Sequence, residues 1–514
     1  METPQSADLL FAQLTAVGRV ATRPWATDHE SAAVVVKGGT VEPSEIAAAA
    51  KRFAYTAAAE GISAESWCVV RLDNPLDILV AVSGLTAIGA IPVLISPGLD
   101  AQTARAALED VPYPMHLLIS EARAGDFPDG LSSNAATLVW EDAVSRPSAK
   151  VAEPLPPNGV ERAPDRPYLA THTSGTTGVP KFVIHTRASF YQQSSVQTRM
   201  LRPMFLRGYL AAAISPVHVR TLSGILSALR LRLSLLLCAS EDPDSIGGLL
   251  ERWRPEYLET HPNTYVTWED LAASGAMASV RIFLGTFDAM HPRTVDRMLA
   301  GSRRRLPVFT EVYAQSELGP ISCRVRMRGM ARGRRGVDAE LAGHRVGWAI
   351  PGYDRVRVVD ESGRKLPQGG QGRIQVRSKG MFAGYLNFPE RTEHLSAGDW
   401  WDSGDWGSLG RSGALRLLDR QVERLDGAPS GIALEDVLMS RIPELSEVVV
   451  LETDGRLLPV IASRGAVPIT DERWAAATHD MPSLEPPRSV AWDDIPRTAT
   501  GKVRREILRG RLTG

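Results

Sequence analysis

The sequence contains few cysteines, and none of them lies in a metal-binding or disulfide pattern. Its 514 residues include three, Cys68, Cys238 and Cys323, which lie far apart and form no CxxC pair. Structural zinc sites and disulfide frameworks need cysteines that are paired at short spacings or even in number. We therefore expect buried, unmodified thiols in a reducing, cytoplasmic environment.

An excess of charge of either sign is also absent. Lysine and arginine together number 58 and aspartate and glutamate 59, which gives a formal net charge of -1. Nucleic acids and anionic membranes attract proteins through a surplus of basic residues. The balance of charge predicts no nucleic-acid partner, and any binding of a polyanion must be local.

Long uninterrupted apolar segments are missing too. The N-terminus lacks the basic start and continuous apolar core of a signal peptide. The most apolar stretch, residues 78–95, is interrupted by Ser83, Gly84, Gly89 and Pro92. A buried helix followed by a strand explains this stretch better than a membrane span does. We expect no membrane partner.

Short β-rich runs alternate with helical patterns over most of the chain. Residues 67–72 and 91–95 are β-rich, and a helix is expected between them over residues 76–89. Such alternation predicts an α/β fold with doubly wound layers. From residue 354 the pattern changes to alternating strands with tight turns, which predicts a small β-rich lobe.

The length of the chain exceeds what one hydrophobic core supports, so several parts are expected. We predict a large N-terminal domain over residues 1–418. Residues 419–514 are expected to form a small α+β C-terminal domain with two strand-like runs and a basic helical tail.

A loop rich in glycine and small hydroxyl residues follows a predicted strand. Residues 171–186 read THTSGTTGVPKFVIHT. Glycine lets backbone amides approach an anion, hydroxyls donate hydrogen bonds, and Lys181 neutralises charge. The common P-loop lysine begins a helix, whereas Pro180 precedes Lys181 here and a β-branched run follows. The loop is predicted to bind phosphates.

This loop resembles the phosphate signature of the adenylate-forming superfamily, which includes acyl-CoA ligases, nonribosomal adenylation domains, luciferase and stand-alone amide ligases. The signature reads SGTTGxPK after a serine or threonine. The residues that match it are Thr173, Ser174, Gly175, Thr176, Thr177, Gly178, Pro180 and Lys181. The resemblance implies an N-terminal AMP-binding domain with the substrate and ATP sites, and a mobile C-terminal domain with the catalytic lysine.

Later stretches resemble further landmarks of the family in the same order. VYAQSELGP resembles YGxTE, with Ala314 in place of glycine and Ser316 in place of threonine. The resemblance implies that Tyr313 stacks near adenine and that Glu317 helps to hold Mg²⁺. WWDSGDWG resembles YxTGD, so Asp405 is implied to accept both ribose hydroxyls. The residues expected to bind ATP or AMP are Thr173, Ser174, Gly175, Thr176, Thr177, Gly178, Lys181, Tyr313, Ala314, Gln315, Ser316, Asp405 and Arg420.

Two stretches are similar to the family's acyl-pocket segments. SPVHVRTLSG is similar to the substrate gate and makes His218 a catalytic and pocket candidate, although a histidine taken alone is more often a satisfied polar group. GTFDAM occupies the place of a pocket-lining stretch, with Phe287 where a small residue is expected. The residues expected to line the pocket are His218, Gly224, Gly285, Phe287 and Ala314. They predict a compact hydrophobic slot for an aromatic or alicyclic carboxylic acid.

The segment IPRTATGKVRRE is similar to the family's C-terminal PxTxxGK and places Lys502 as its catalytic lysine. Read alone, the segment is a basic surface turn. In the family's reaction, attack of a carboxylate on the α-phosphate of ATP gathers negative charge that cations must meet. The resemblance implies that Lys502 bridges the two groups and that the products are an acyl-adenylate and pyrophosphate.

The resemblance leaves the acceptor open. A hinge is expected within residues 417–427, where Arg420 aligns as a ribose contact and the family's GRxD is not intact. A CoA thiol, beside Gly427 or Gly431, is the commonest outcome in the family. An amide synthetase with an amine acceptor, or loading of a carrier protein, is the alternative. ATP and Mg²⁺ are the implied cofactors, with CoA as co-substrate.

An arginine-rich run, residues 324–336, is compatible with the 3′-phosphate of CoA or with a solvated loop. A nucleotide-binding regulator without turnover is disfavoured because Lys502, Glu317 and Asp405 are all present.

Overall fold

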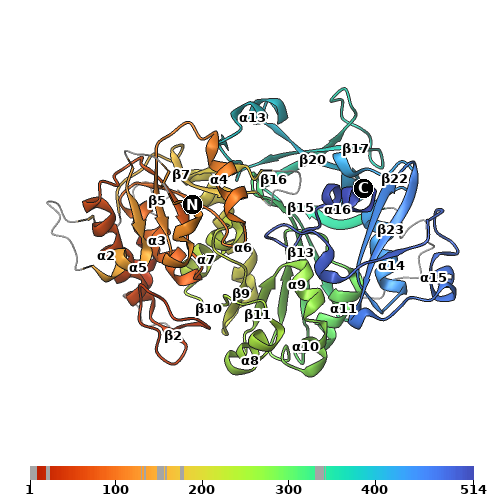
Figure 1. The fold of residues 1–514 in the computed structure, drawn as a ribbon, viewed down its shortest axis with the longest axis horizontal. Coiled ribbons are helices and arrows are strands. Elements are labelled where there is room, and N and C mark those ends of the chain that lie inside the picture. Colours follow the sequence, from red (N-terminus) through yellow and green to blue (C-terminus); the bar gives the residue numbers. More distant parts are fainter. Residues whose placement is uncertain are drawn as a thin grey trace. The chain divides into compact units, whose positions relative to one another are not determined.

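The structure is a computed structural model (Figure 1) that describes residues 9–18, 24–128, 130–131, 135–146, 155–156, 159–173, 179–329, 341 and 343–513. The chain divides into two compact units. Unit 1 consists of Met1–Glu259, Ser316–Gly319 and Lys379–His394. Unit 2 consists of Thr260–Gln315, Pro320–Ser378 and Leu395–Gly514. The expected domain boundary after residue 418 stays a prediction.

Unit 1 contains a mostly parallel seven-stranded sheet. Its strands lie in the order β18 (Gly384–Tyr385), β8 (Phe182–Thr186), β7 (Pro167–His172), β4 (Ile91–Leu94), β3 (Trp67–Arg71), β5 (Met115–Ile119) and β6 (Thr137–Val139). The strands from β7 to β6 are parallel, whereas β8 pairs antiparallel with both β7 and β18. The loop predicted to bind phosphates therefore connects the two antiparallel strands β7 and β8.

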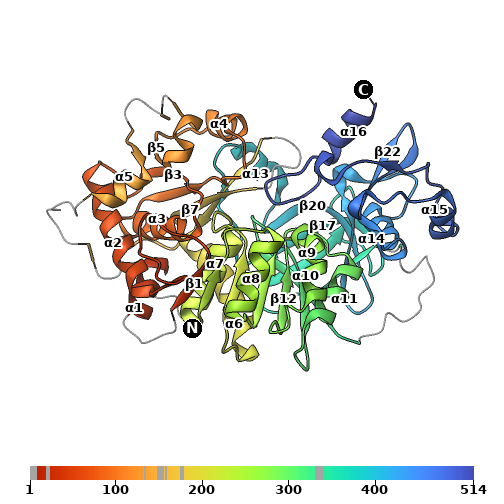
Figure 2. The same ribbon diagram turned by 60° about the horizontal axis from the view of Figure 1, so that its bottom comes forward.

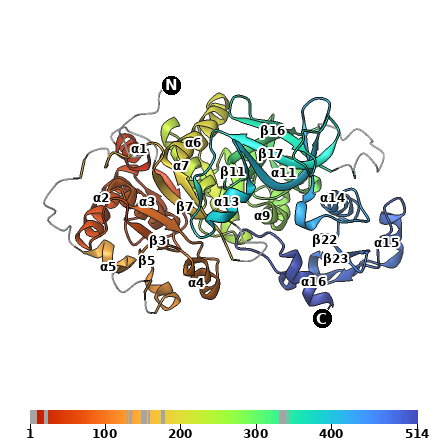
Figure 3. The same ribbon diagram turned by 90° about the horizontal axis from the view of Figure 1, so that it is seen from above.

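Helices pack on this sheet and confirm the interpretation of the most apolar stretch. Helix α3 (Pro75–Ala87) is buried along its whole length and contacts both β3 and α2 (Pro43–Ala59), as Figure 3 shows. Residues 78–95 thus form a buried helix followed by strand β4. No described helix is long and apolar enough to cross a membrane.

A second set of strands in unit 1 combines two strands that follow α6 (Arg187–Leu201) with one from near the N-terminus. Strands β9 (Leu210–Ala213), β10 (Leu235–Leu237) and β1 (Trp25–Thr27) are parallel. Helix α7 (Val219–Leu231) leaves the carboxyl end of β9 and lies beside α6 (Figure 2). The other elements of this unit are α1 (Leu9–Gly18), β2 (Thr40–Val41), α4 (Ala101–Glu109), α5 (Trp140–Ser145), α8 (Pro243–Trp253) and β11 (Tyr257–Thr260).

Unit 2 begins with three helices and a mixed sheet. The helices are α9 (Pro262–Thr267), α10 (Glu269–Ser274) and α11 (Pro292–Gly301). The strands lie in the order β12 (Ile282–Gly285), β13 (Val308–Gln315), β14 (Gly319–Met327), β15 (His344–Ala349), β21 (Leu415–Arg420), β20 (Trp400–Leu409), β17 (Gln371–Ser378) and β16 (Asp354–Val359). The antiparallel pairs β16–β17 and β17–β20 form the β-rich part expected after residue 354. The short strand β19 (Ser396–Ala397) precedes β20, whereas helix α13 (Pro389–Leu395) belongs to unit 1 except for its last residue.

The C-terminal segment of unit 2 has its own small sheet. Strands β22 (Leu445–Thr453) and β23 (Arg456–Ser463) are antiparallel, and β24 (Arg488–Ser489) runs parallel to β23. Helix α14 (Gly431–Arg441) packs on β22 (Figure 1). Helices α15 (Asp471–Thr478) and α16 (Arg505–Thr513) follow. The two strand-like runs and the helical tail expected from the sequence are confirmed.

All three cysteines are free, as the sequence predicts. Cys68 and Cys238 are buried and Cys323 is half-buried. Burial raises the pKa of the Cys68 thiol to about 12, so this group stays protonated and packs as a small apolar side chain.

One glycine of β15 allows the close pairing of β14 and β15. Gly347 has a φ of +89° and lies at an irregularity in the pairing of β15 with β21. A Cβ atom on Gly347 would lie 1.9 Å from the carbonyl oxygen of Cys323 on β14. Only glycine fits there, because the position combines left-handed backbone with direct backbone contact.

We expect Gly347→Ala to lower the thermal unfolding midpoint by at least about 5 °C more than Gly363→Ala. Gly363 has a similar φ of +82°, but a Cβ atom there would meet nothing within 4 Å. Both variants therefore carry the backbone strain, and only the first carries the clash. Differential scanning calorimetry of both variants makes the comparison, and equal midpoints would contradict it.

Candidate active site

The two ends of the predicted phosphate loop are bonded to each other in unit 1. The amide of Thr173 donates to the carbonyl of Lys181 at 2.8 Å, and the amide of Lys181 donates to Oγ1 of Thr173 at 3.2 Å. The loop therefore leaves and re-enters the sheet at one point. The residues of the loop that lie outside the described part of the chain are Ser174, Gly175, Thr176, Thr177 and Gly178.

Lys181 and Glu317 contact the same tyrosine. Nζ of Lys181 lies 5.1 Å from the ring centroid of Tyr385, and the hydroxyl of Tyr385 donates to Oε1 of Glu317 at 2.6 Å. The predicted phosphate lysine and the predicted metal ligand are thus brought together, next to Ser316. The sequence alone did not single out Tyr385.

Glu317 suits a magnesium ion that is bound mainly through phosphate. No cluster of three or more His, Cys, Asp or Glu side chains able to hold a metal occurs among the described residues. Mg²⁺ commonly binds one or two carboxylates together with water and the phosphates of a nucleotide, rather than a cage made by the protein alone. A single buried carboxylate beside a phosphate lysine fits that requirement.

Two buried histidines meet where the phosphate loop begins. The ring of His172, the last residue of β7, lies 5.6 Å from the ring of His218. Nε2 of His172 accepts from the amide of Ser96 at 3.1 Å, so its proton resides on Nδ1, which faces the carbonyl of Thr173 at 2.7 Å. Burial lowers the pKa of His172, which keeps the ring neutral. His218 directly precedes α7, beside the start of the loop.

A buried carboxylate organises the ribose side of the predicted site in unit 2. Oδ2 of Asp405 accepts from the hydroxyl of Tyr313 at 2.6 Å and from Nε2 of Gln315 at 3.0 Å. Nε of Arg420 lies 3.3 Å from Oδ1, because Asp405 and Arg420 are direct partners in the β20–β21 ladder. Asp405 raises the pKa of Arg420 further above its ordinary value. The structure brings these four predicted residues together, with Ala314 between two of them.

Lys502 lies in a tight turn of the same unit. Its amide donates to Oγ1 of Thr498 at 3.2 Å, and the preceding Gly501 accepts a hydrogen bond from Nδ2 of Asn263, on α9. Burial lowers the pKa of Lys502, while the negative charge of Asp288 opposes this effect. The charged neighbours that influence the Lys502 pKa are Asp288, Arg420, Asp405 and Glu423. The lysine therefore belongs to the electrostatic group that surrounds Asp405.

The stretch GTFDAM contributes a strained residue and an acid. Phe287 has a φ of +80°, rare for a non-glycine residue, and its ring lies 4.6 Å from that of His261. Burial lowers the pKa of His261 to about 4, and Lys502 adds to this effect. A Cβ atom on Gly285 would lie 2.7 Å from Cγ of Met290. The sequence alone missed Asp288 and His261, since their neighbour Lys502 comes from a distant segment.

The described arginines of residues 324–336 are engaged within unit 2. Arg324 pairs with Glu311 at 3.4 Å and Arg326 with Asp296 at 2.8 Å. Arg328 donates to the carbonyl of Leu299 at 2.6 Å. Residues 330–336 lie outside the described part of the chain. These contacts give the three arginines a role in packing.

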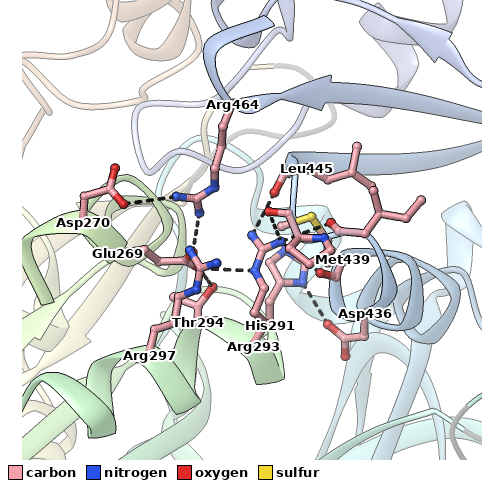
Figure 4. Close-up of polar contacts among 12 residues, drawn as sticks. Glu269, Asp270, His291, Arg293, Thr294, Arg297, Asp436, Met439, Leu445 and Arg464 are labelled. Atoms are coloured by element: carbon pink, nitrogen blue, oxygen red, sulfur yellow. Dashed lines mark hydrogen bonds and ion pairs between the residues drawn. The ribbon is translucent and has the colours of Figure 1, made fainter. Parts of the chain in front are cut away.

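The C-terminal segment that carries Lys502 is attached to α10, α11 and β15 by a buried polar cluster, which we call the docking cluster (Figure 4). Its members are Glu269, His291, Arg293, Asp436 and Arg464, which Figure 4 labels, together with His344. Glu269 of α10 is fully buried and pairs with Arg464, which follows β23. Arg293 donates to the carbonyls of Met439 and Leu445, each at 2.9 Å, and so satisfies the carboxyl end of α14.

The other half of the docking cluster is a carboxylate between two imidazoles. Oδ1 of Asp436 lies 2.9 Å from Nδ1 of His291, and Oδ2 lies 2.8 Å from Nδ1 of His344. Burial opposes charge on both rings, but Asp436 outweighs it and raises the pKa of each histidine. The two histidines in turn overcome burial and lower the pKa of Asp436.

The sequence of this chain is similar to a known protein family and to characterised members of it. The sequence profile described as AMP-binding enzyme matches residues 22–386. The chain is 36% identical over 479 residues to 3-amino-2-hydroxy-4-methoxybenzoate diazotase of Streptomyces cremeus, covering 88% of this chain and 85% of that protein. It is 25% identical over 498 residues to indoleacetate–CoA ligase of Aromatoleum aromaticum, covering 91% and 92%.

A solved structure shows the same fold. The ATP-bound MatB of Rhodopseudomonas palustris aligns with a TM-score of 0.79 at 18% sequence identity, over 98% of each chain. The α/β architecture predicted from the sequence, including the C-terminal segment, is therefore the architecture of these enzymes.

The docking cluster predicts a pH-dependent contribution to stability. A histidine whose pKa is higher in the folded than in the unfolded protein stabilises the folded state. This contribution is complete below the unfolded-state pKa of about 6.5 and is lost as the pH rises through the folded-state pKa. The lowered pKa of Asp436 gives a contribution that is present above about pH 4 and lost as the pH falls. The cluster is therefore expected to stabilise most between about pH 4 and 6.5.

We expect Asp436→Asn to lower the thermal unfolding midpoint by about 3–8 °C at pH 5.5 and by less than about 2 °C at pH 9. Asp296→Asn is the matched control, because its partner is the guanidinium of Arg326 rather than an imidazole. Its effect should not change with pH. A deficit for Asp436→Asn that is equal at both pH values would refute the assignment.

Proposed function

The chain belongs to the AMP-binding enzyme family and is an AMP-forming, acid-activating ligase, and from this premise we propose that its acceptor is an aromatic amine and its activated acid is nitrite. The enzyme would thus be an ATP-dependent diazotase. The observation that carries the proposal is the 36% identity to a diazotase over 88% of this chain, against 25% to a CoA ligase over a similar length.

The surroundings of two glycines also support an amine over CoA. In CoA ligases a glycine after the hinge lies beside the pantetheine arm, and Gly427 and Gly431 are the candidates here. A Cβ atom on Gly427 would lie 3.4 Å from Leu457, and one on Gly431 would lie 3.0 Å from Oδ1 of Asp419. Each glycine therefore has a neighbouring side chain on the side where its Cβ atom would point. An amine needs no such passage.

Nitrite resembles a carboxylate in the property that this chemistry uses. Both are planar anions with two equivalent oxygens. A nitrite oxygen attacks the α-phosphorus of ATP, and the bond from that phosphorus to pyrophosphate breaks. The amine nitrogen then attacks the nitrite nitrogen, the N–O bond to AMP breaks, and a proton leaves the amine. The resulting nitrosamine takes up a proton and loses water to give the diazonium product, without an oxidant or reductant.

The chain's own residues divide this work in the proposal. Lys181 would hold the outer phosphates, and Glu317 would bind a Mg²⁺ ion that would neutralise part of their charge. Asp405 holds the ribose. Lys502 meets the negative charge that gathers when the anion attacks the α-phosphate, which is where a preorganised cation lowers the barrier most. Burial of Lys502 strengthens this effect, because less water screens its charge.

Nitrite-dependent pyrophosphate release tests the proposal. Purified protein with ATP and Mg²⁺ is expected to release pyrophosphate on addition of nitrite and an aminobenzoate, and the diazonium product is trapped as an azo dye with a phenol coupling partner. Product should require nitrite, ATP and the amine together. A benzoate panel with CoA is run in parallel, and formation of an acyl-CoA without any azo dye would instead assign a thiol acceptor.

Lys502→Ala is expected to lower the rate of pyrophosphate release by about 10²–10⁴-fold, because it removes a cation from the charged transition state. ATP binding, measured by calorimetry, should change far less. Lys365→Ala, which removes an exposed lysine of unit 2, should leave the rate unchanged. If Lys502→Ala kept more than half of the wild-type rate, Lys502 would not be the catalytic lysine.

A further inference from the structure

A buried ion pair lies at the start of α7, and neither the family nor the sequence assigns it a role. Nη2 of Arg220 lies 2.9 Å from Oε2 of Glu259. The hydroxyl of Tyr257 donates to the same oxygen at 2.9 Å, and Nη1 of Arg220 donates to Oε1 of Gln197. The side chains of Arg220 and Glu259 are only 14% and 9% exposed. All four residues belong to unit 1.

The hydrogen bonding of this group is incomplete on one side. Oε2 of Glu259 accepts from two donors, whereas Oε1 is buried and has no hydrogen-bond partner in the described part of the chain. A buried carboxylate oxygen without a donor is costly. Burial raises the pKa of Glu259 even though Arg220 opposes this effect. The group is therefore built to accept one more hydrogen bond.

The position of Glu259 ties it to the predicted substrate site. Glu259 is the penultimate residue of β11, and α7 follows the carboxyl end of β9. Ligands of open α/β sheets bind outside the carboxyl ends of the strands. His218 immediately precedes α7, and its ring contacts that of His172, which precedes the phosphate loop. A continuous series of side chains thus leads from the loop to the first turn of α7.

The surroundings of Gly224 differ from the hydrophobic slot that the sequence predicts. A Cβ atom on Gly224 would lie 3.1 Å from Nη1 of Arg220 and 3.3 Å from Oε1 of Gln197. The predicted pocket residue therefore faces charged and amide groups. Arg220 and Gln197 are already hydrogen-bonded to each other. Oε1 of Glu259 is the atom of this group that has no donor among the described residues, and a ring with a polar donor would supply one.

We propose that Oε1 of Glu259 accepts a hydrogen bond from a hydroxyl or amino substituent on the substrate's aromatic ring, distinct from the amine that reacts. This assignment rests on the proposed function and adds the substrate class to it, namely an aromatic amine with a second ring donor. Arg220 and Tyr257 are positioning residues, because their bonds to Oε2 hold the carboxylate so that Oε1 remains free.

Replacement of Glu259 by glutamine is expected to remove the preference for a ring donor while keeping the shape of the side chain. The side chains of Arg220 and Tyr257 donate to the position of Oε2. The glutamine amide is therefore expected to place its oxygen at that position. The amide NH₂ then occupies the place of Oε1 and presents donors. A ring hydroxyl and a ring ether oxygen can both accept from this NH₂ group, so Glu259→Gln should lose the preference for the hydroxyl.

The experiment compares matched pairs of aminobenzoates that carry either a hydroxyl or a methoxy group at the same ring position. Wild-type protein is expected to favour the hydroxy compound at one ring position by about 10–100-fold in kcat/KM, the effect of one hydrogen bond to a charged acceptor. Glu259→Gln should bring that ratio to about 1. Calorimetric affinities for the same pairs without nitrite should change in the same direction.

Glu256→Gln is the matched control. Glu256 is a buried glutamate next to the same strand, and its carboxylate accepts from the amides of Arg207 and Gly208. Its replacement should leave the hydroxy-to-methoxy ratio as in the wild type. No azo product with any amine would refute the proposed function itself. Product with no hydroxy preference, or with a preference that Glu259→Gln retains, would refute only the role of Glu259.

Discussion

The carboxylate of Asp405 is the group on which the predicted nucleotide site of unit 2 depends. It lies on β20 and draws together a phenol and an amide from β13 and a guanidinium from β21. A buried carboxylate is tolerated only when donors or cations surround it. The ordered strands supply them here, so the geometry of the sheet and the chemistry of the site support each other. The charges of Asp405 and Arg420 also influence the pKa of Lys502.

The contacts that attach the C-terminal segment to the rest of unit 2 hold Lys502 near the residues that surround Asp405. The turn that carries the lysine is bonded to α9 through Asn263, and the helix α14 is bonded through Asp436 and Arg293. These contacts are polar and directional. An interface of this kind releases and re-forms more readily than an apolar core, because water replaces the hydrogen bonds that are broken. It suits a segment that the family moves between two half-reactions.

The proposal for the acceptor of the activated group rests on the surroundings of two glycines and of one buried glutamate. Gly427 and Gly431 have Leu457 and Asp419 as neighbours, whereas Oε1 of Glu259 has no hydrogen-bond donor among the described residues. A buried acceptor of this kind suits a substrate that carries a hydroxyl or amino group. A site that hydrogen-bonds a polar substituent discriminates against analogues that lack it far more strongly than an apolar pocket discriminates by size.

The amino-acid sequence by itself determined the order of the family landmarks, from the loop at Thr173 to the turn at Lys502, and with it the α/β fold and the ATP-dependent chemistry. These motifs are local, since backbone conformation and ligand chemistry need only short runs of residues. Only the tertiary structure decided which distant side chains meet. Tyr313 and Asp405 are 92 residues apart, and His291 and Asp436 are 145 apart. Glu259 lies in an ordinary strand pattern, and its importance follows from burial and from the donors that reach only one of its oxygens. Burial and partner geometry arise when separate segments pack together, so no local pattern encodes them.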